Sequence, residues 1–546
     1  MSWIHRSRRV RLGTVAIAAT ICLFNVSPAD AATPAEEARL LLEQSGITGG
    51  FVVHLGCGNG EATAALRAND RLQVQGLSSD AAQVAEARER LTEQGSYGPV
   101  AVDTFDGQTL PYIDNLVNLV VVDGESVARD ELLRVLTPNG VAMIRDGDQW
   151  SKLTKPWPEE IDDWTHYLYD SKGNAVAHDQ RAGPPRHLQW LGSPRWSRHH
   201  DRMASMSALV SARGRIFYIM DEGSRVSIQL PPRWTLLARD AFNGTILWRQ
   251  PIPEWQNHLW PLKSGPTQLA RRLVAVDDRV FVTLGFHAPV TMIDAGTGET
   301  RRVFEATAGT EELLVNNGLL LAQVNRGAME TDDYAPALNV GDQGRVAREY
   351  AWNQKPREIM AIDIETGETL WSRETTMAPL TMTLDEQRAY FHDGQKVVCL
   401  DRKTGDQLWT SEPAARRQTI TMNFGPKLVV YKSVVLFAGG DRTMKAFDSA
   451  TGKHLWTAPH AQSGYQSPED LLVANGLVWS APTTRTQDSG IYSGLDPLTG
   501  EVKVEFPPAV DTYWFHHRCY IAKGTDRFIM PSRTGVEFVD TLTQKW

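Results

Sequence analysis

Cysteine is scarce in this 546-residue chain, which contains only four. Cys22 lies in an N-terminal apolar run, and Cys57, Cys399 and Cys519 are widely separated. The sequence has no adjacent cysteines, no Cys-x-x-Cys and no Cys-x-x-Cys-His. These absences exclude a disulfide framework, a cysteine-based zinc site and covalently attached haem.

An excess of positive charge is also missing. The chain has 56 Lys and Arg against 65 Asp and Glu, a net charge of -9 and a pI of about 5.9. We therefore expect no nucleic-acid partner. What is abundant is tryptophan, with 17 residues, together with 43 glycines and 29 prolines. Many turns and many large rings favour an all-β repeat architecture for much of the chain.

The N-terminus has no apolar run long enough to favour a membrane span. Four arginines precede Leu12–Val26, which is followed by Ala29-Asp30-Ala31. A basic region, a short apolar region and an Ala-x-Ala site are typical of a secretory signal peptide. We predict a signal peptide over residues 1–31 and a periplasmic or otherwise extracytoplasmic mature protein without a stable membrane span. An uncleaved anchor is the alternative.

Residues 35–150 alternate apolar runs with helical patterns, which predicts a parallel, doubly wound α/β sheet. The predicted helices cover Glu61–Ala68, Ala81–Leu91 and Asp130–Leu136. The predicted strands are Phe51–Leu55, Leu72–Leu77, Val100–Val102, Leu116–Val122 and, as the last one, Val141–Ile144.

A glycine-rich turn, Leu55-Gly56-Cys57-Gly58-Asn59-Gly60, joins the first strand to the first helix. Such turns let a ligand approach backbone N–H groups. With Asp106–Pro111 and Leu133–Gly140, this turn makes the region resemble class I S-adenosylmethionine-dependent methyltransferases. The resemblance covers about 100 residues, implies a Rossmann-like fold, and points to a set of cofactor-binding positions: Gly56, Gly58, Gly60, Ser78 and Asp106.

The departures from that family concern function. His54 stands where the family usually has an acidic residue, and Ser78 stands where a carboxylate usually binds the two ribose hydroxyls. A serine cannot chelate a diol as a carboxylate does, although Asp80 could substitute if the turn shifts. The family's sixth and seventh strands are expected to be absent, because Trp150 runs into a Pro- and Trp-rich linker. S-adenosylmethionine is also a cytoplasmic cofactor, so a scaffold without turnover is favoured over an active methyltransferase.

Residues 151–205 are predicted to be a linker and the strand that leads into the next domain. Lys155-Pro156-Trp157-Pro158 breaks helix and strand alike. Asp163–Tyr167 and Pro184–Trp190 resemble the first strand of quinoprotein-like propellers.

Residues 206–546 contain a recurring phrase in which Asp is followed by Gly four residues later and by Trp four residues after that. The clear copies begin at Asp240, Asp363, Asp401 and Asp448, and weaker ones at Asp294, Asp496 and Asp540. The intervals are 54, 69, 38, 47, 48 and 44 residues, which suits one four-stranded blade per repeat. The longest interval holds a polar insert, 325–357, that we predict to be a loop.

This phrase resembles the repeat of quinoprotein alcohol dehydrogenase-like β-propellers. The resemblance implies a propeller of seven or eight four-stranded blades, but it leaves activity open because that superfamily contains both dehydrogenases and binding proteins. The Asp is expected to accept backbone N–H groups in its turn, the Gly to supply positive φ, and the Trp to pack between blades. Closure of the ring is expected near Trp190, unless the chain is a fragment.

Quinone-dependent members of this superfamily often have adjacent cysteines and a calcium site, and neither is identifiable here. Histidine clusters remain, at His199-His200-Asp201 and at His516-His517-Arg518-Cys519, with Asp163, His166 and Asp179 as further polar candidates. Adjacent residues on a strand point to opposite faces, so a structural or surface role is favoured over metal binding.

The sequence thus predicts an extracytoplasmic binding or scaffold protein with a protein or small-molecule ligand at the propeller face and no identified catalytic residue. A pyrroloquinoline quinone (PQQ)-dependent dehydrogenase and an S-adenosylmethionine-dependent methyltransferase are the alternatives.

Overall fold

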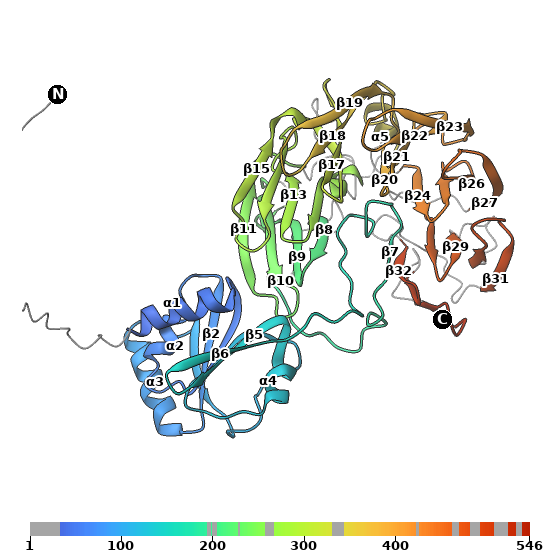
Figure 1. Ribbon diagram of the computed structural model, residues 1–546. Helices are drawn as coiled ribbons and strands as arrows, with labels where there is room; N and C mark the ends of the chain where they lie inside the picture. The colour runs from blue at the N-terminus through green and yellow to red at the C-terminus, as the bar shows by residue number, and fades with distance from the viewer. Residues whose placement is uncertain are drawn as a thin grey trace, which may run out of the picture.

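The computed structural model describes residues 33–193, 198, 205–227, 230–256, 267–329, 343–421, 425–460, 469–480, 492–506, 522–530 and 538–545 (Figure 1). The predicted signal peptide, both adjacent-histidine clusters and Cys519 lie outside these residues. No helix in the described part of the chain is long and apolar enough to cross a membrane.

The N-terminal domain is an α/β sheet of six strands in the order β3-β2-β1-β4-β5-β6. Strands β1 to β5 are parallel. Buried aliphatic residues such as Val52, Val74 and Leu119 form a core on one face, and Val53, Leu77 and Val120 form one on the other. The strands are β1 (Gly50–Leu55), β2 (Leu72–Ser78), β3 (Val100–Thr104), β4 (Val117–Val122), β5 (Leu136–Asp146) and β6 (Gln149–Thr154). The helices are α1 (Pro34–Ser45), α2 (Glu61–Ala65), α3 (Ala81–Glu93) and α4 (Arg129–Val135).

The prediction that Val141–Ile144 ends this sheet was wrong. Strand β6 pairs antiparallel with β5 and contains residues 151–154, which were assigned to the linker. The two residues between the strands are Gly147 and Asp148, and Gly147 has φ 60°. A two-residue hairpin therefore reverses the chain. The mostly exposed side chains of β6 gave no apolar run to signal a strand.

Seven further sheets of four strands follow among the described residues, and we number them blades 1 to 7 (Figure 1). Blades 1 to 6 are antiparallel, and their strands follow one another in chain order from the axis outward. Blades 1 to 3 consist of β8 (Met206–Ala212), β9 (Arg215–Asp221), β10 (Trp234–Asp240) and β11 (Ile246–Ile252); β12 (Leu273–Val276), β13 (Arg279–Thr283), β14 (Val290–Asp294) and β15 (Thr300–Phe304); and β16 (Thr310–Asn316), β17 (Leu319–Val324), β18 (Arg357–Asp363) and β19 (Thr369–Thr375).

Blades 4 to 6 repeat the arrangement. They consist of β20 (Thr383–Leu384), β21 (Arg388–His392), β22 (Lys396–Asp401) and β23 (Gln407–Pro413); β24 (Lys427–Tyr431), β25 (Val434–Ala438), β26 (Thr443–Asp448) and β27 (His454–Pro459); and β28 (Leu472–Ala474), β29 (Leu477–Ser480), β30 (Tyr492–Leu495) and β31 (Val502–Phe506). The short 3-10 helices η1 (Thr267–Arg272) and η2 (Glu305–Thr307) precede β12 and β16. The insert predicted to be a loop contains a short helix, α5 (Gln343–Glu349). The prediction missed this helix because about two helical turns are too few to show an apolar periodicity.

Blade 7 is assembled from two distant parts of the chain. Strands β32 (Lys523–Thr525), β33 (Phe528–Met530) and β34 (Val539–Asp540) form a meander. Strand β7 (Val176–Ala177) comes from the segment before the propeller and pairs in parallel with β32. The seventh sheet of the propeller therefore includes a strand that comes before every other propeller strand in the chain.

The repeated Asp and Gly have the roles predicted from the sequence. In blade 4, one carboxylate oxygen of Asp401 accepts hydrogen bonds from the N–H groups of Lys403 and Thr404, at 2.8 and 3.0 Å. Gly405 closes this turn with φ 75°, a conformation that side chains disfavour. The turn thus depends on both residues.

The repeated Trp lies between blades, as predicted. Trp371 of blade 3 donates its indole N–H to the carbonyl oxygen of Arg402 in blade 4, at 2.9 Å. Its ring covers Gly405, where an added Cβ would lie 2.6 Å from the ring. Trp248, Trp409 and Trp456 make the equivalent bonds to Ala295, Ser449 and Pro497.

Two junctions use other residues for this purpose. Between blades 2 and 3, the guanidinium of Arg302 donates to the carbonyl oxygens of Glu365 and Thr366. At blade 1, Trp190 of the linker donates to the carbonyl oxygen of Ala241, at 2.9 Å, and covers Gly244. Trp190 thus takes the place that the preceding blade's Trp has elsewhere.

The axis of the propeller is occupied by residues 164–177, which we call the axial segment (Figure 1). It exchanges a hydrogen bond with the innermost strand region of every blade in turn. For blades 1 to 3, the carbonyl oxygens of Trp164 and Thr165 and the ring of His166 accept the N–H groups of Ser211, Ala275 and Val315. For blades 4 and 5, the carbonyl oxygens of Ser171 and Lys172 accept those of Leu384 and Val430. For blades 6 and 7, the side chain of Asn174 and the carbonyl oxygen of Ala175 accept those of Val473 and Gly524. One segment therefore holds all seven blades.

Candidate functional site

The glycine-rich turn lies at the carboxyl edge of the N-terminal sheet, which we define as the loops that follow β1, β2 and β4. Gly56, Gly58 and Gly60 all have positive φ, as this turn requires. A Cβ on Gly56 would collide with the carbonyl oxygen of Asp123, so the turn packs directly on the loop after β4. The N–H groups of Gly56 and Cys57 both donate to the carbonyl oxygen of Leu77, at 2.8 and 3.2 Å. These two donors are therefore engaged within the protein.

Ser78, the predicted ribose-binding position, is buried at the end of β2. Its hydroxyl donates to Gln83, at 3.1 Å, and accepts the N–H of Asp80, at 3.1 Å. Asp80, the possible substitute, accepts the N–H of Ala82 and caps α3. Both side chains thus serve the start of this helix.

Glu125 is the carboxylate at this edge that the sequence reasoning missed. It follows β4, and one of its oxygens accepts both the N–H and the hydroxyl of Ser79, at 2.8 and 2.9 Å. The only sequence signal was an acidic residue three positions past the end of a buried strand.

Asp106 is likewise used by its own turn. One oxygen accepts the N–H groups of Thr109 and Gln108, at 2.6 and 2.8 Å, and these bonds lower the pKa of the carboxyl. His54 is buried beneath the edge, where its Nδ1 lies 2.8 Å from the hydroxyl of Thr63. Burial lowers the pKa of His54 to about 4, so this ring is a neutral core group.

These observations test the fit of S-adenosylmethionine. The fold and the glycine turn suit it, but β2 ends in Ser78 and not in a carboxylate, Asp80 caps α3, and Glu125 occupies the donors of Ser79. The side chains at this edge therefore do not fit S-adenosylmethionine in the way that is usual for the methyltransferase family.

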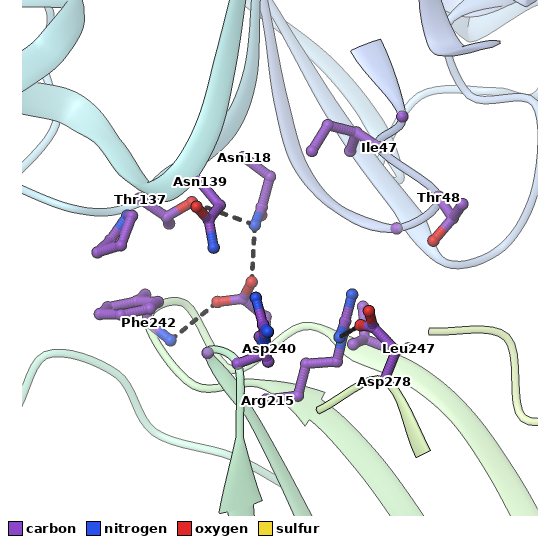
Figure 2. Close-up of a pocket in the computed structure, with 15 residues that line it drawn as sticks. Ile47, Thr48, Asn118, Thr137, Asn139, Arg215, Asp240, Phe242, Leu247 and Asp278 are labelled. Carbon is purple, nitrogen blue, oxygen red and sulfur yellow. Dashed lines mark hydrogen bonds and ion pairs between the residues drawn. The ribbon is translucent and has the colours of Figure 1, made fainter. Parts of the chain in front are cut away.

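The opposite, amino-terminal edge of the sheet contacts blade 1 around a cavity of about 220 Å³ (Figure 2). Asn118 of β4 donates to the buried carboxylate of Asp240, at 2.7 Å. Asn243, in the turn that follows, donates back to Asn118, at 2.7 Å, and to the carbonyl oxygen of Leu116, at 2.9 Å. Burial raises the pKa of Asp240, and Asn118 opposes that shift. This junction is a closed network, and it leaves the carboxyl edge on the side away from the propeller.

Charged side chains surround the axis next to the axial segment. Arg271 pairs with buried Glu312, at 2.8 Å, and donates to the carbonyl oxygen of Met382. Lys427 of β24 is buried, and its ammonium has no hydrogen-bond partner among the described residues. Burial lowers the pKa of Lys427 to about 8.

The polar candidates of the linker bind backbone groups. His166 is buried and accepts the N–H of Val315, at 3.1 Å, and burial lowers the pKa of His166 to about 3. Asp163 accepts the N–H of Arg213, and Asp179 those of Arg181 and Ala182. In the described ranges, no three His, Cys, Asp or Glu side chains converge as a metal site.

Comparison with known proteins agrees with this architecture. The profile of the family described as "Outer membrane protein assembly factor BamB" matches residues 355–508, and that of "Methyltransferase domain" matches residues 52–140. The chain joins a methyltransferase-like domain to a quinoprotein-like β-propeller.

Individual relatives cover parts of the chain. The ubiquinone/menaquinone biosynthesis C-methyltransferase UbiE of Hydrogenovibrio crunogenus is 29% identical over 153 residues, which is 26% of this chain, and the chain spans 59% of that relative's length. BamB from Moraxella catarrhalis matches with a TM-score of 0.35 and 14% identity, over 59% of this chain and 77% of that one. Quinohemoprotein alcohol dehydrogenase from Comamonas testosteroni matches with a TM-score of 0.41 and 13% identity, over 67% and 69%.

Proposed function

We propose that this chain is an extracytoplasmic binding or scaffold protein whose methyltransferase-like domain is degenerate. The observation that carries the proposal is the axial segment. The chain's own backbone occupies the propeller axis and is hydrogen-bonded to all seven blades. A propeller stabilised in this way is a rigid platform, and its faces remain for a protein or small-molecule partner.

The N-terminal domain supports the same proposal. Ser78, Asp80 and Asp106 bind backbone or side-chain groups of their own loops, and the domain is held on blade 1 through Asn118 and Asn243. Its preserved role would then be to present a surface in a fixed orientation.

The test uses the full chain with an affinity tag. Export predicts cleavage after Ala31 and recovery from the extracytoplasmic fraction, which N-terminal sequencing of the purified protein checks. Crosslinkers at the exposed ends of the blade loops should capture a reproducible partner, whereas crosslinkers on the outer strands should not.

Two assays on the same preparation can contradict the proposal. The first is transfer of a labelled methyl group from S-adenosylmethionine, and the second is dye-linked alcohol oxidation after addition of PQQ and calcium. Robust turnover in either assay would replace the scaffold role with an enzymatic one.

A further inference from the structure

The contact between Glu125 and Ser79 spans the place where ligands bind to sheets of this type. In open α/β sheets, ligands bind outside the carboxyl ends of the strands, where the strand order reverses. That point here is the pair β1 and β4, since the order is β3-β2-β1-β4. Glu125 follows β4 and Ser79 follows β2, so their contact passes across the end of β1.

The spacing of the strands sets the distance between the loops that follow β2 and β4. Strands β2 and β4 flank β1, and neighbouring strands are about 4.8 Å apart, so the two loops are roughly 10 Å apart. Glu125 bridges that span, and its charge also acts on Cys57 in the glycine turn. By contrast, a Cβ on Gly58 or Gly124 would meet no atom within 4 Å. The loops are therefore open around a bridge made by one side chain.

The bridge uses the hydrogen-bond donors that a ligand would need. Ser79 presents an N–H and a hydroxyl, and both are taken by the same carboxylate oxygen. Ring nitrogens of a purine and oxygens of a ribose are neutral acceptors for such donors. A carboxylate is a stronger acceptor than either, because its hydrogen bonds are charge-assisted.

We propose that Glu125 is a built-in competitor at this edge and that an adenine nucleoside binds there only when the Glu125 carboxylate leaves Ser79. The role goes beyond the scaffold function, because it assigns a closed ligand position to the N-terminal domain. Glu125 is then the residue that sets whether this domain is occupied.

The test is calorimetric titration of the full chain with S-adenosylmethionine and with adenosine. Glu125→Ala should bind either ligand at least about tenfold more tightly than the natural chain, the effect of about 1.4 kcal/mol expected for freeing two exposed donors. Glu125→Gln should fall between them, since an amide oxygen accepts more weakly. Ser126→Ala changes an exposed neighbour on the same loop and should match the natural chain.

Hydrogen exchange gives a second, ligand-free measurement. The amide of Ser79 should exchange faster in Glu125→Ala than in Ser126→Ala, which tests the bridge itself. Weaker binding by Glu125→Ala would overturn the proposal and identify Glu125 as a ligand contact. Equal binding by both variants, or none by any form at millimolar ligand, would also overturn it, while leaving the scaffold role untouched.

Discussion

The glycine turn of the N-terminal domain and the aspartate–glycine turns of the propeller are built from the same residue type in the same backbone region. They differ in what surrounds them. Gly58 has φ 49° and faces open space, whereas Gly405 has φ 75° and lies under the ring of Trp371. Positive φ alone thus marks a turn, and its surroundings distinguish a loop open to a ligand from a joint of the scaffold.

The propeller turn is where a substitution should have the largest effect. Gly405→Val adds a side chain to a positive-φ residue and drives it into Trp371, so we expect a loss of about 3–4 kcal/mol in the free energy of unfolding. Gly476→Val is the matched control, since Gly476 has φ 74° with no atom near its Cβ position, and should lose about 1–2 kcal/mol. Denaturant unfolding followed by tryptophan fluorescence measures both. Equal losses would mean that the indole contributes nothing at this joint.

The axial segment should be next in sensitivity. Asn174 is buried and both donates to and accepts from the backbone of Val473, at 2.9 and 2.8 Å. Asn174→Ala leaves both groups unpaired, so we expect a cost of about 2–3 kcal/mol. Hydrogen exchange should accelerate at the Val473 amide.

Lys172→Ala is the control, because Lys172 holds blade 5 through its backbone and its side chain forms only a partly exposed pair with Glu386. It should cost about 1 kcal/mol or less. If it costs as much as Asn174→Ala, the side-chain bond to blade 6 has no special weight.

Acid should loosen the same segment. The folded pKa of His166 is about 3, against about 6.5 unfolded, so below pH 6.5 the unfolded chain binds the extra proton. Stability is full above pH 6.5 and falls as the pH drops toward 3, by about 2 kcal/mol at pH 5. His166→Gln should remove this part of the difference between unfolding at pH 7.5 and pH 5. An unchanged difference would show that His166 does not titrate on unfolding.

The domain junction should show the smallest effect. Asn243→Thr installs the residue found at this position in other repeats and removes two hydrogen bonds to the N-terminal domain. We expect a loss of about 1 kcal/mol and faster proteolysis between residues 155 and 163. Thr404→Asn makes the reverse change in blade 4, away from that junction, and should leave proteolysis unchanged.

The parts of the fold predicted from the sequence are those in which local chemistry is sufficient. Asp401 and Gly405 form their turn from neighbouring residues, and Trp371 needs only the next repeat. The parallel strands of the N-terminal domain could be predicted because both of their faces are buried, which makes them apolar runs in the sequence. Strand β6 was missed because its side chains are mostly exposed.

The site was less predictable, because its contacts are long-range. Nothing local to Glu125 says that its carboxylate crosses β1 to reach Ser79, 46 residues earlier. Asn243 stands where the other repeats have threonine, and its partner Asn118 lies 125 residues away. The glycine positions follow from backbone geometry, whereas side-chain partners across loops depend on the packed structure.

The axial segment also determines how long a chain loop each blade closes. Its bonds to blade 1 join residues 47 apart, whereas its bonds to blade 6 join residues 299 apart. Each later blade therefore closes a longer chain loop onto an element made before any of them, at an entropy cost that rises only slowly with length. Each blade can therefore attach to a segment that precedes it in the chain, and blades 1 to 6 do not depend on pairing between the last strands of the propeller and β7.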